Sequence, residues 1–143
     1  MTDFDLSSEQ DWVKFLPSFQ VSAINGLLEE GLSEDEVIDL WLGKPVVKNN
    51  APFGATEFSR DFSEKFRVEF RKFICGGEEY DDLREEVSKL WEKNKLVVVS
   101  TIAAAIGAVL GLAVGVLTPV VAVAISIVAK LGKNAWCEMH LQS

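Results

Sequence analysis

Histidine is almost absent from this chain of 143 residues, which has only His140, close to its C-terminal end. The nucleophile-elbow, HExxH, Walker and dinucleotide-binding glycine patterns are missing as well. Carboxylate pairs are common, but in a chain this acidic they do not single out a catalytic site. We therefore expect a non-enzymatic protein. The weakest alternative is an enzyme subunit that contributes carboxylates to a shared site.

Cysteine is equally scarce, since Cys75 and Cys137 are the two present. Two cysteines in a chain of this size indicate neither a disulfide framework nor a zinc site. The acidic first residues lack the apolar run of a secretory signal. We expect a chain that begins in the cytosol with reduced thiols. Although Cys137 and His140 have a Cys-x-x-His spacing, we expect no metal and no cofactor.

Positive charge is outnumbered, because 14 Lys and Arg face 22 Asp and Glu, for a formal net charge of −8. Residues 1–95 carry 12 basic and 21 acidic side chains, a net of −9, and residues 96–143 carry two and one, a net of +1. Binding of nucleic acid requires basic residues that neutralise phosphates, so we expect no such partner. The composition indicates an acidic cytoplasmic helical domain, 1–95, and a hydrophobic helical hairpin with a short tail, 96–143.

The first 95 residues have the pattern of short amphipathic helices separated by glycine and proline. Ser7 with Gln10, and Ser33 with Glu36, have the spacing of a capping box. Predicted helices occupy about 7–17, 18–30 and 33–43, and a loop covers 44–55. A longer helix follows, with five phenylalanines on one face, and the double glycine at 76–77 separates it from an acidic helix whose amphipathic pattern disappears at Leu96. The five phenylalanines are Phe58, Phe62, Phe66, Phe70 and Phe73. The pattern predicts an all-α fold.

Charged side chains are absent from Leu96 to Ala129, a run of 34 residues, whereas about 20 suffice for a transmembrane helix. Within the run, small residues recur every four positions and predict a flat ridge against which another helix can pack closely. The ridge consists of Ala103, Gly107, Gly111 and Gly115. Thr118 followed by Pro119 favours the start of a second helix, so we expect a hairpin of residues 97–117 and 119–138 with its turn at this pair.

Both ends of the uncharged run have the lysine and tryptophan residues that settle at a membrane interface, and lysine marks the cytoplasmic side. These flanks are Trp91, Lys93, Lys95, Lys130, Lys133 and Trp136. The second arm is short in this prediction, because Pro119 to Ala129 reaches only about 17 Å against about 30 Å for the first arm. We therefore expect a hairpin that is re-entrant, tilted or oligomeric.

Two functions fit these features. The leading hypothesis is a membrane-perturbing or pore-forming effector at the cytoplasmic face of a membrane. Its glycine-ridged hairpin self-associates in the bilayer, and a regulatory protein or clustering triggers it. The alternative is a soluble cytoplasmic adaptor or assembly domain, with the hairpin buried in its core or against a protein partner. A soluble fold has to break the helix that otherwise runs from Asp82 to Leu117, and we expect the break between Asn94 and Thr101. The layout resembles that of pore-forming colicins and Bcl-2-type proteins in architecture, without shared motifs.

Overall fold

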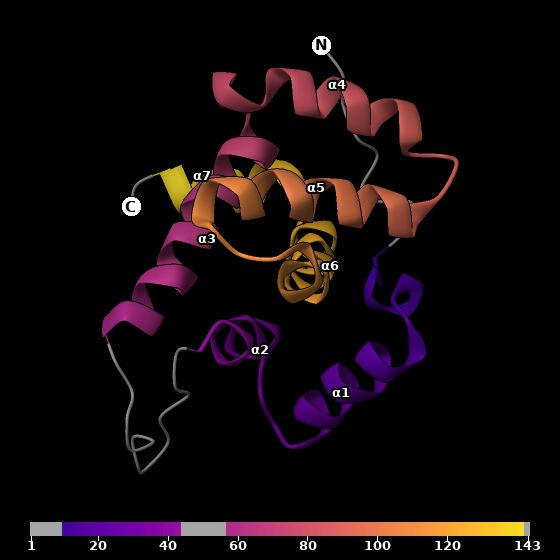
Figure 1. Ribbon diagram of the computed structural model, residues 1–143, viewed down its shortest axis with the longest axis vertical. Helices are drawn as coiled ribbons and strands as arrows, with labels where there is room; N and C mark the ends of the chain where they lie inside the picture. The colour runs from indigo at the N-terminus through magenta and orange to yellow at the C-terminus, as the bar shows by residue number, and fades with distance from the viewer. Residues whose placement is uncertain (1–9, 44–56, 142–143) are drawn as a thin grey trace.

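The computed structural model describes residues 10–43 and 57–141, and within these ranges it contains helices and no strand. The protein is therefore all-α, as the sequence predicts. In chain order the helices are η2 (Val13–Phe15), α1 (Ser18–Glu29), α2 (Glu34–Trp41), α3 (Glu57–Cys75), η3 (Glu78–Tyr80), α4 (Asp81–Leu90), α5 (Lys95–Leu110), α6 (Val114–Leu131) and α7 (Lys133–Leu141). Figure 1 shows α6 near the centre of the molecule, with the other helices around it.

Helices α1 and α2 begin and end close to where the local signals indicate. The capping box at α2 is confirmed, because the Ser33 hydroxyl accepts a hydrogen bond from the Glu36 N–H (3.1 Å) and the Glu36 carboxylate accepts one from the Ser33 N–H (2.9 Å). Of the helix predicted over 7–17, residues 7–9 lie outside the described residues, and within 10–17 only Val13–Phe15 is helical, as the single turn η2. The prediction is therefore wrong for most of its described part. The predicted loop at 44–55 and the Thr56 cap also lie outside them.

The aromatic face of α3 is part of the core. Phe66, Phe70 and Phe73 are almost completely buried and Phe62 is partly buried, whereas the side chain of Phe58 lies outside the described residues. Phe66 stacks on Phe70 with ring centroids 5.6 Å apart, and Phe70 meets Trp136 of α7 edge to face at 5.7 Å. The aromatic face of α3 therefore holds α7 against the rest of the protein.

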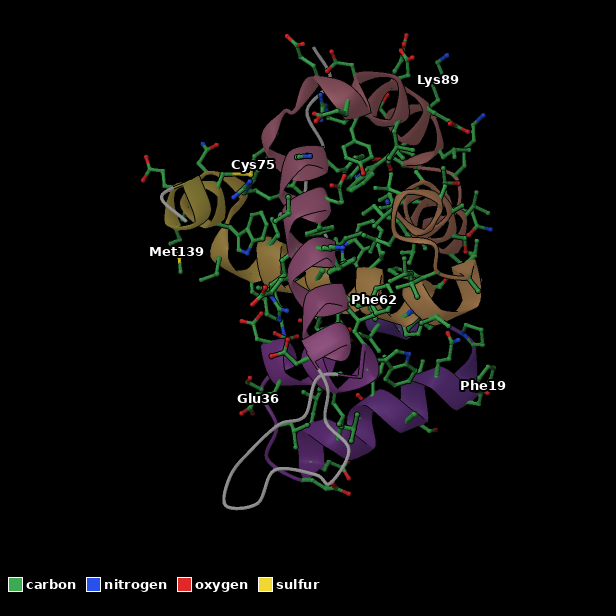
Figure 2. The ribbon with its side chains drawn as sticks, turned by 60° about the vertical axis from the view of Figure 1, so that its left-hand side comes forward. Phe19, Glu36, Phe62, Cys75, Lys89 and Met139 are labelled. Atoms are coloured by element: carbon green, nitrogen blue, oxygen red, sulfur yellow. A yellow bond between two sulfur atoms is a disulfide. The ribbon has the colours of Figure 1, made fainter. Side chains whose placement is uncertain are left out.

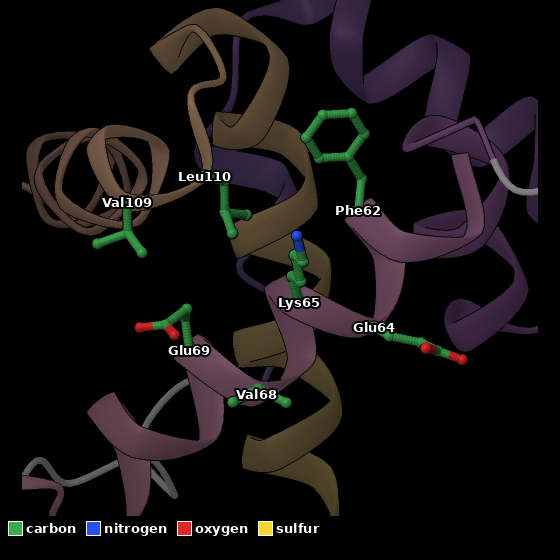
Figure 3. Close-up of a pocket in the computed structure, with 7 residues that line it drawn as sticks. All are labelled: Phe62, Glu64, Lys65, Val68, Glu69, Val109 and Leu110. Atoms are coloured by element: carbon green, nitrogen blue, oxygen red, sulfur yellow. The ribbon is translucent and has the colours of Figure 1, made fainter. Parts of the chain in front are cut away.

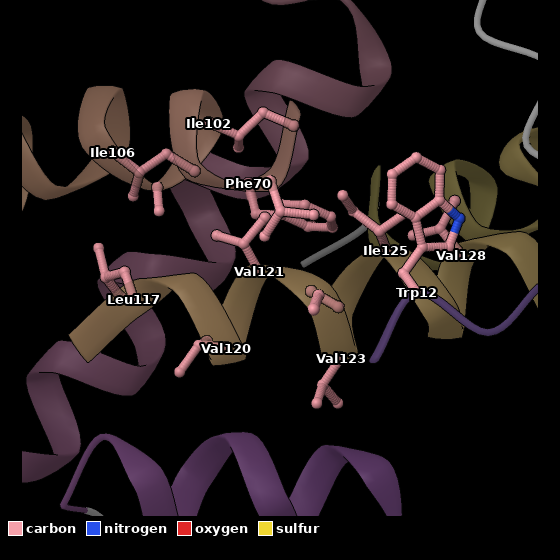
Figure 4. Close-up of a cluster of buried hydrophobic side chains, with 14 of the residues drawn as sticks. Trp12, Phe70, Ile102, Ile106, Leu117, Val120, Val121, Val123, Ile125 and Val128 are labelled. Carbon is pink, nitrogen blue, oxygen red and sulfur yellow. The ribbon is translucent and has the colours of Figure 1, made fainter. Parts of the chain in front are cut away.

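Helix α6 is the central element of the fold. Every residue from Leu117 to Ser126 is buried, with α5 on one side and α2 on the other (Figure 4). The buried Ser126 hydroxyl accepts a hydrogen bond from the Trp12 N–H (2.9 Å) and donates one to the Ala122 carbonyl (3.0 Å). This buried polar contact joins the segment before η2 to α6, and one hydrophobic core includes residues from both 1–95 and 96–143.

The long helix predicted from Asp82 onward is broken, but earlier than expected. Helix α4 ends at Leu90 and α5 begins at Lys95, so the break covers residues 91–94 and its last residue is Asn94. The Asn94 side chain caps α5 by accepting a hydrogen bond from the Val97 N–H at 3.1 Å. The break lets α4 fold back along α5.

The predicted hairpin turn at Thr118 and Pro119 is wrong, because both residues lie inside α6 and the turn occupies 111–113. Gly111 adopts the left-handed conformation (φ 77°), and its N–H and that of Leu112 both bond to the Gly107 carbonyl, at 2.7 and 3.0 Å. The Thr118 hydroxyl donates to the Val114 carbonyl (2.8 Å) instead of capping a helix. Pro119 has no N–H to donate to the carbonyl of Gly115, four residues earlier. Gly115 is exposed, so water can supply that hydrogen bond instead.

The expectation of reduced thiols is also wrong, since Cys75 and Cys137 form a disulfide. The fold brings their Cα atoms to 5.9 Å, within the range that a disulfide can bridge, although 62 positions separate them along the chain. Local sequence patterns do not indicate that two residues so far apart in the chain lie close together in space. The bond joins the last residue of α3 to the middle of α7 (Figure 2).

Candidate functional site

The turn between α5 and α6 forms an uncharged exposed surface, which we call the hairpin tip and define as residues 108–116. Seven of these nine residues are exposed, and Leu110 and Leu112 are partly exposed. Val109 is 60% exposed, Val114 41% and Val116 40%. Turns in water-soluble helical proteins are ordinarily polar, so an exposed turn of valine, leucine, alanine and glycine requires an explanation.

The outer face of α5 continues this uncharged surface. Val97, Ala104 and Ala108 are exposed, and Ser100 and Thr101 are its only hydroxyl residues. An open groove runs between this face and α4, and Glu86 is the one charged side chain that lines it in the described structure. The exposed side of a surface helix normally carries charged residues, and α5 carries none between Lys95 and its end.

A second depression, of about 530 Å³, lies where the tip meets α3 (Figure 3). Val109 and Leu110 of the tip form one wall, while Phe62 and Val68 belong to α3. Three charged α3 side chains lie around it, namely Glu64, Lys65 and Glu69. The tip therefore borders charged side chains of α3 at this depression.

The four residues of the predicted ridge do not lie on one helix. Ala103 and Gly107 are buried on the inner side of α5, Gly111 ends that helix, and Gly115 lies exposed in the first turn of α6. A Cβ on Gly107 would lie 2.5 Å from the Leu112 carbonyl oxygen, whereas one on Gly115 would meet nothing within 4 Å. A continuous ridge is thus wrong for this structure, and self-association through these residues stays a prediction.

The predicted interface flanks make contacts within the protein. The Lys95 ammonium lies 5.2 Å from the ring centroid of Trp91 and 5.5 Å from that of Trp12, and it also donates a hydrogen bond to the Trp91 carbonyl. Lys130 forms an ion pair with Glu34 of α2 at 2.8 Å. Trp136 is buried against α3, Lys133 is partly buried, and Lys93 is exposed. Their role at a membrane interface stays a prediction.

The corrected turn makes the two arms of the hairpin equal. The uncharged part of α5 is residues 96–110 and that of α6 is residues 114–129, which correspond to lengths of about 22 and 24 Å. By length and composition α6 is apolar enough to cross a membrane, with a mean hydropathy of 2.2, although 67% of it is buried inside the protein. Helix α5 is apolar but shorter. The short second arm expected from the sequence is therefore not found.

A polar corner at the end of α3, whose central residue is Arg84, has no counterpart among the sequence predictions. Its buried guanidinium donates to the carbonyls of Phe73 (2.9 Å), Lys72 (3.1 Å) and Gly77 (2.8 Å), and it also pairs with Asp81. These bonds add a charged donor to carbonyls around the end of α3, where those of Lys72 and Gly77 also accept the N–H groups of Gly77 and Tyr80. No sequence pattern signals this role, because an arginine in an acidic amphipathic helix ordinarily faces solvent.

A second set of contacts tightens the same corner. The Tyr80 hydroxyl donates to Glu69 (2.6 Å), and Lys72 lies 3.3 Å from both Glu69 and Glu79. Burial, together with the bond to Glu69, raises the pKa of Tyr80. Hydrogen bonds to Glu79 and Glu69 raise the pKa of Lys72. The pKa of Glu79 is lowered, because its carboxylate accepts hydrogen bonds from the Glu79 backbone N–H and from Lys72. The end of α3 is consequently a well-fixed point of the fold.

No known protein family, no curated protein and no solved structure matches this chain. Among residues 10–43 and 57–141, no three His, Cys, Asp or Glu side chains are grouped to hold a metal ion.

Proposed function

We propose that this is a non-enzymatic protein that carries its hydrophobic hairpin inside a water-soluble globule and inserts it, tip first, into a lipid bilayer. The observation that carries this proposal is the exposed tip, residues 108–116, which contains no charged side chain. A soluble protein gains nothing by presenting such a turn to water. A hairpin that enters a membrane needs it, because a charged turn would have to cross the hydrocarbon region.

The energetics of transfer favour the same proposal. The buried side chains of α6, such as Val120, Val121 and Ile125, leave one apolar environment for another when the hairpin moves from the core into lipid. The transfer moves no ionisable group between Lys95 and Lys130. Arms of about 22 and 24 Å approach the roughly 30 Å thickness of the hydrocarbon core. Insertion is opposed by the loss of the core contacts that α2 makes with α6 and α3 makes with α5.

A soluble adaptor is the second candidate, and the burial of α6 favours it. In this case the hairpin stays in the core, and the exposed face of α5 with the groove beside α4 contacts a protein partner. The two candidates differ in what happens when lipid is the only partner offered. Membrane insertion requires no second protein, whereas an adaptor remains in solution. Self-association of inserted hairpins is the further step by which insertion would perturb the membrane.

One pair of matched variants tests membrane insertion. Ala104 and Ala23 are both exposed helical alanines, Ala104 in the middle of the α5 arm and Ala23 on α1. Ala104 is nine residues from Lys95, or about 13 Å along the helix, so it would lie near the bilayer centre. A lysine there costs about 2.5–3.5 kcal/mol. Ala104→Lys should therefore reduce partitioning into the membrane by roughly 70- to 400-fold, and Ala23→Lys should leave it unchanged.

The measurement is flotation of the protein with uncharged phosphatidylcholine vesicles, before and after reduction of the disulfide. Uncharged lipid prevents the added positive charge from attracting either variant to the surface. Circular dichroism and the unfolding midpoint should be alike for both variants, because both sites are exposed. If wild-type protein stays with the soluble fraction in both redox states, or if both lysine variants partition equally, membrane insertion by the hairpin is excluded.

A further inference from the structure

The Cys75–Cys137 disulfide encloses the whole hydrophobic hairpin in a covalent loop. Its two cysteines are 62 positions apart, and α4, α5 and α6 all lie between them. One end of the loop is the last residue of α3 and the other is in α7. Any movement of the hairpin relative to α3 therefore has to occur inside a closed loop.

The α3 end of the loop is firmly held. Arg84 bonds the carbonyls of Phe73 and Gly77 on either side of Cys75, and Tyr80 bonds Glu69 one turn and a half earlier. These contacts come from η3 and α4, which do not belong to the hairpin. Cys75 is therefore fixed to η3 and α4, which lie outside the hairpin.

The α7 end of the loop is attached directly to the hairpin. Gly132 alone separates the end of α6 from the start of α7, so α7 has to follow α6 if that helix leaves the core. Besides the disulfide, the packing of Trp136 on Phe70 holds α7 against α3. The exposed residues of α7 include Asn134, Ala135 and Met139. The disulfide is thus the one covalent cross-link, apart from the backbone itself, that holds the C-terminal end of α6 beside α3 within the described residues.

We propose that this disulfide is a redox latch on the hairpin. While it is closed, the C-terminal end of α6 stays beside α3 and the hairpin is held in the globule. Reduction releases α7 and permits insertion. This inference rests on the proposed membrane function. It assigns the stored form to an oxidising compartment and the inserting form to surroundings that contain thiol reductants.

The chemistry of release is thiol–disulfide exchange with a dithiol. A thiolate of the dithiol attacks one sulfur, a mixed disulfide forms, and the second thiol of the reductant resolves it. The Cys75–Cys137 bond gains two electrons and two protons and becomes two thiols, while the dithiol is oxidised to a disulfide. Both cysteines are partly exposed, so a small dithiol has access to them.

The test measures dye release from phosphatidylcholine vesicles by the full-length chain, oxidised or treated with dithiothreitol. The latch predicts release that is at least about tenfold faster after reduction, because closing a loop of this length restricts the chain strongly. A Cys75→Ser, Cys137→Ser double variant should release dye at the fast rate with or without reductant. Adding Ala104→Lys to this variant should abolish release.

A general loss of stability is controlled with Ile24→Ala, which leaves a cavity in the core at α1, far along the chain from the disulfide. Oxidised Ile24→Ala should remain as slow as the oxidised wild type. Equal release by oxidised and reduced wild type would overturn the latch and leave membrane insertion standing, as would fast release by oxidised Ile24→Ala. Absence of release and of vesicle binding in both redox states would overturn the membrane function, and the latch with it.

Discussion

Three glycines spaced four residues apart in the uncharged run should respond in three different ways to the same substitution. Gly107, Gly111 and Gly115 are equivalent in the sequence pattern, but the structure places one inside α5, one at its end and one at the start of α6. Alanine at each position adds one methyl group and changes no charge. The effect on the free energy of unfolding can therefore be assigned to backbone geometry and to the space around each Cβ.

At Gly107 the added Cβ would lie 2.5 Å from the Leu112 carbonyl oxygen, a backbone atom that can move only if the turn moves. Such overpacking costs about 1–3 kcal/mol, and the gain of roughly 1 kcal/mol in helix propensity offsets part of it. At Gly111 the space is open, but φ is +77°, where alanine is disfavoured by about 1–2 kcal/mol. At Gly115 nothing lies within 4 Å, so alanine should stabilise by about 0.5–1 kcal/mol.

Urea unfolding followed by far-ultraviolet circular dichroism measures all three values. We expect Gly115→Ala to be more stable than the wild type and both other variants to be less stable, with a span of about 0.5–3 kcal/mol between Gly115→Ala and Gly107→Ala. Gly111→Asn provides a control, since asparagine tolerates the left-handed conformation better than alanine. If one straight helix ran through all three positions, each alanine would stabilise the protein. That result would refute the turn at 111–113.

Two further predictions concern the polar corner at the end of α3. Tyr80 is the only tyrosine, and its pKa is raised above the ordinary value of 10.0, so the folded protein should show no tyrosinate absorbance as the pH passes 10, whereas the urea-unfolded chain should. The contribution of the Tyr80 hydroxyl to stability is fully present below pH 10 and is lost as the pH rises beyond it. The Tyr80→Phe variant should not show this loss. Titration of Tyr80 near pH 10 in the folded protein would exclude the bond to Glu69. Arg84→Met should lower the free energy of unfolding by about 2–4 kcal/mol, because it removes the guanidinium donor from the carbonyls of Phe73, Lys72 and Gly77, while the exposed Lys89→Met on the same helix should change it by less than about 0.5 kcal/mol. Equal urea midpoints for the two variants would show that Arg84 does not hold the corner.

The exposed tip and the disulfide place different demands on the same hairpin. The tip presents to water an uncharged surface of the kind that lipid or a partner covers, and the disulfide restrains the far end of the same two helices. A protein that only needed a stable core would gain from the disulfide but not from the tip. The combination is the reason for treating storage and release of the hairpin as one mechanism.

Several features of the protein follow from the sequence by local rules. Ser33 and Glu36 set the start of α2 because a capping box involves residues only three apart. The spacing of Phe66, Phe70 and Phe73 determines one buried face of α3 through the 3.6-residue period of the helix. The absence of charge from Leu96 to Ala129 determines that two apolar helices need apolar surroundings. None of these features requires knowledge of a distant contact.

Only the tertiary structure decided the position of the turn, the state of the cysteines and the surroundings of α6. Gly111 and the Thr118–Pro119 pair are both acceptable helix boundaries locally, and the unbroken burial from Leu117 to Ser126 against α2 and α5 selects Gly111. Cys75 and Cys137 meet because the aromatic face of α3 brings α7 alongside it. The physical reason is common to all three: local propensity acts over about four residues, whereas these outcomes depend on which distant side chains pack together in one core.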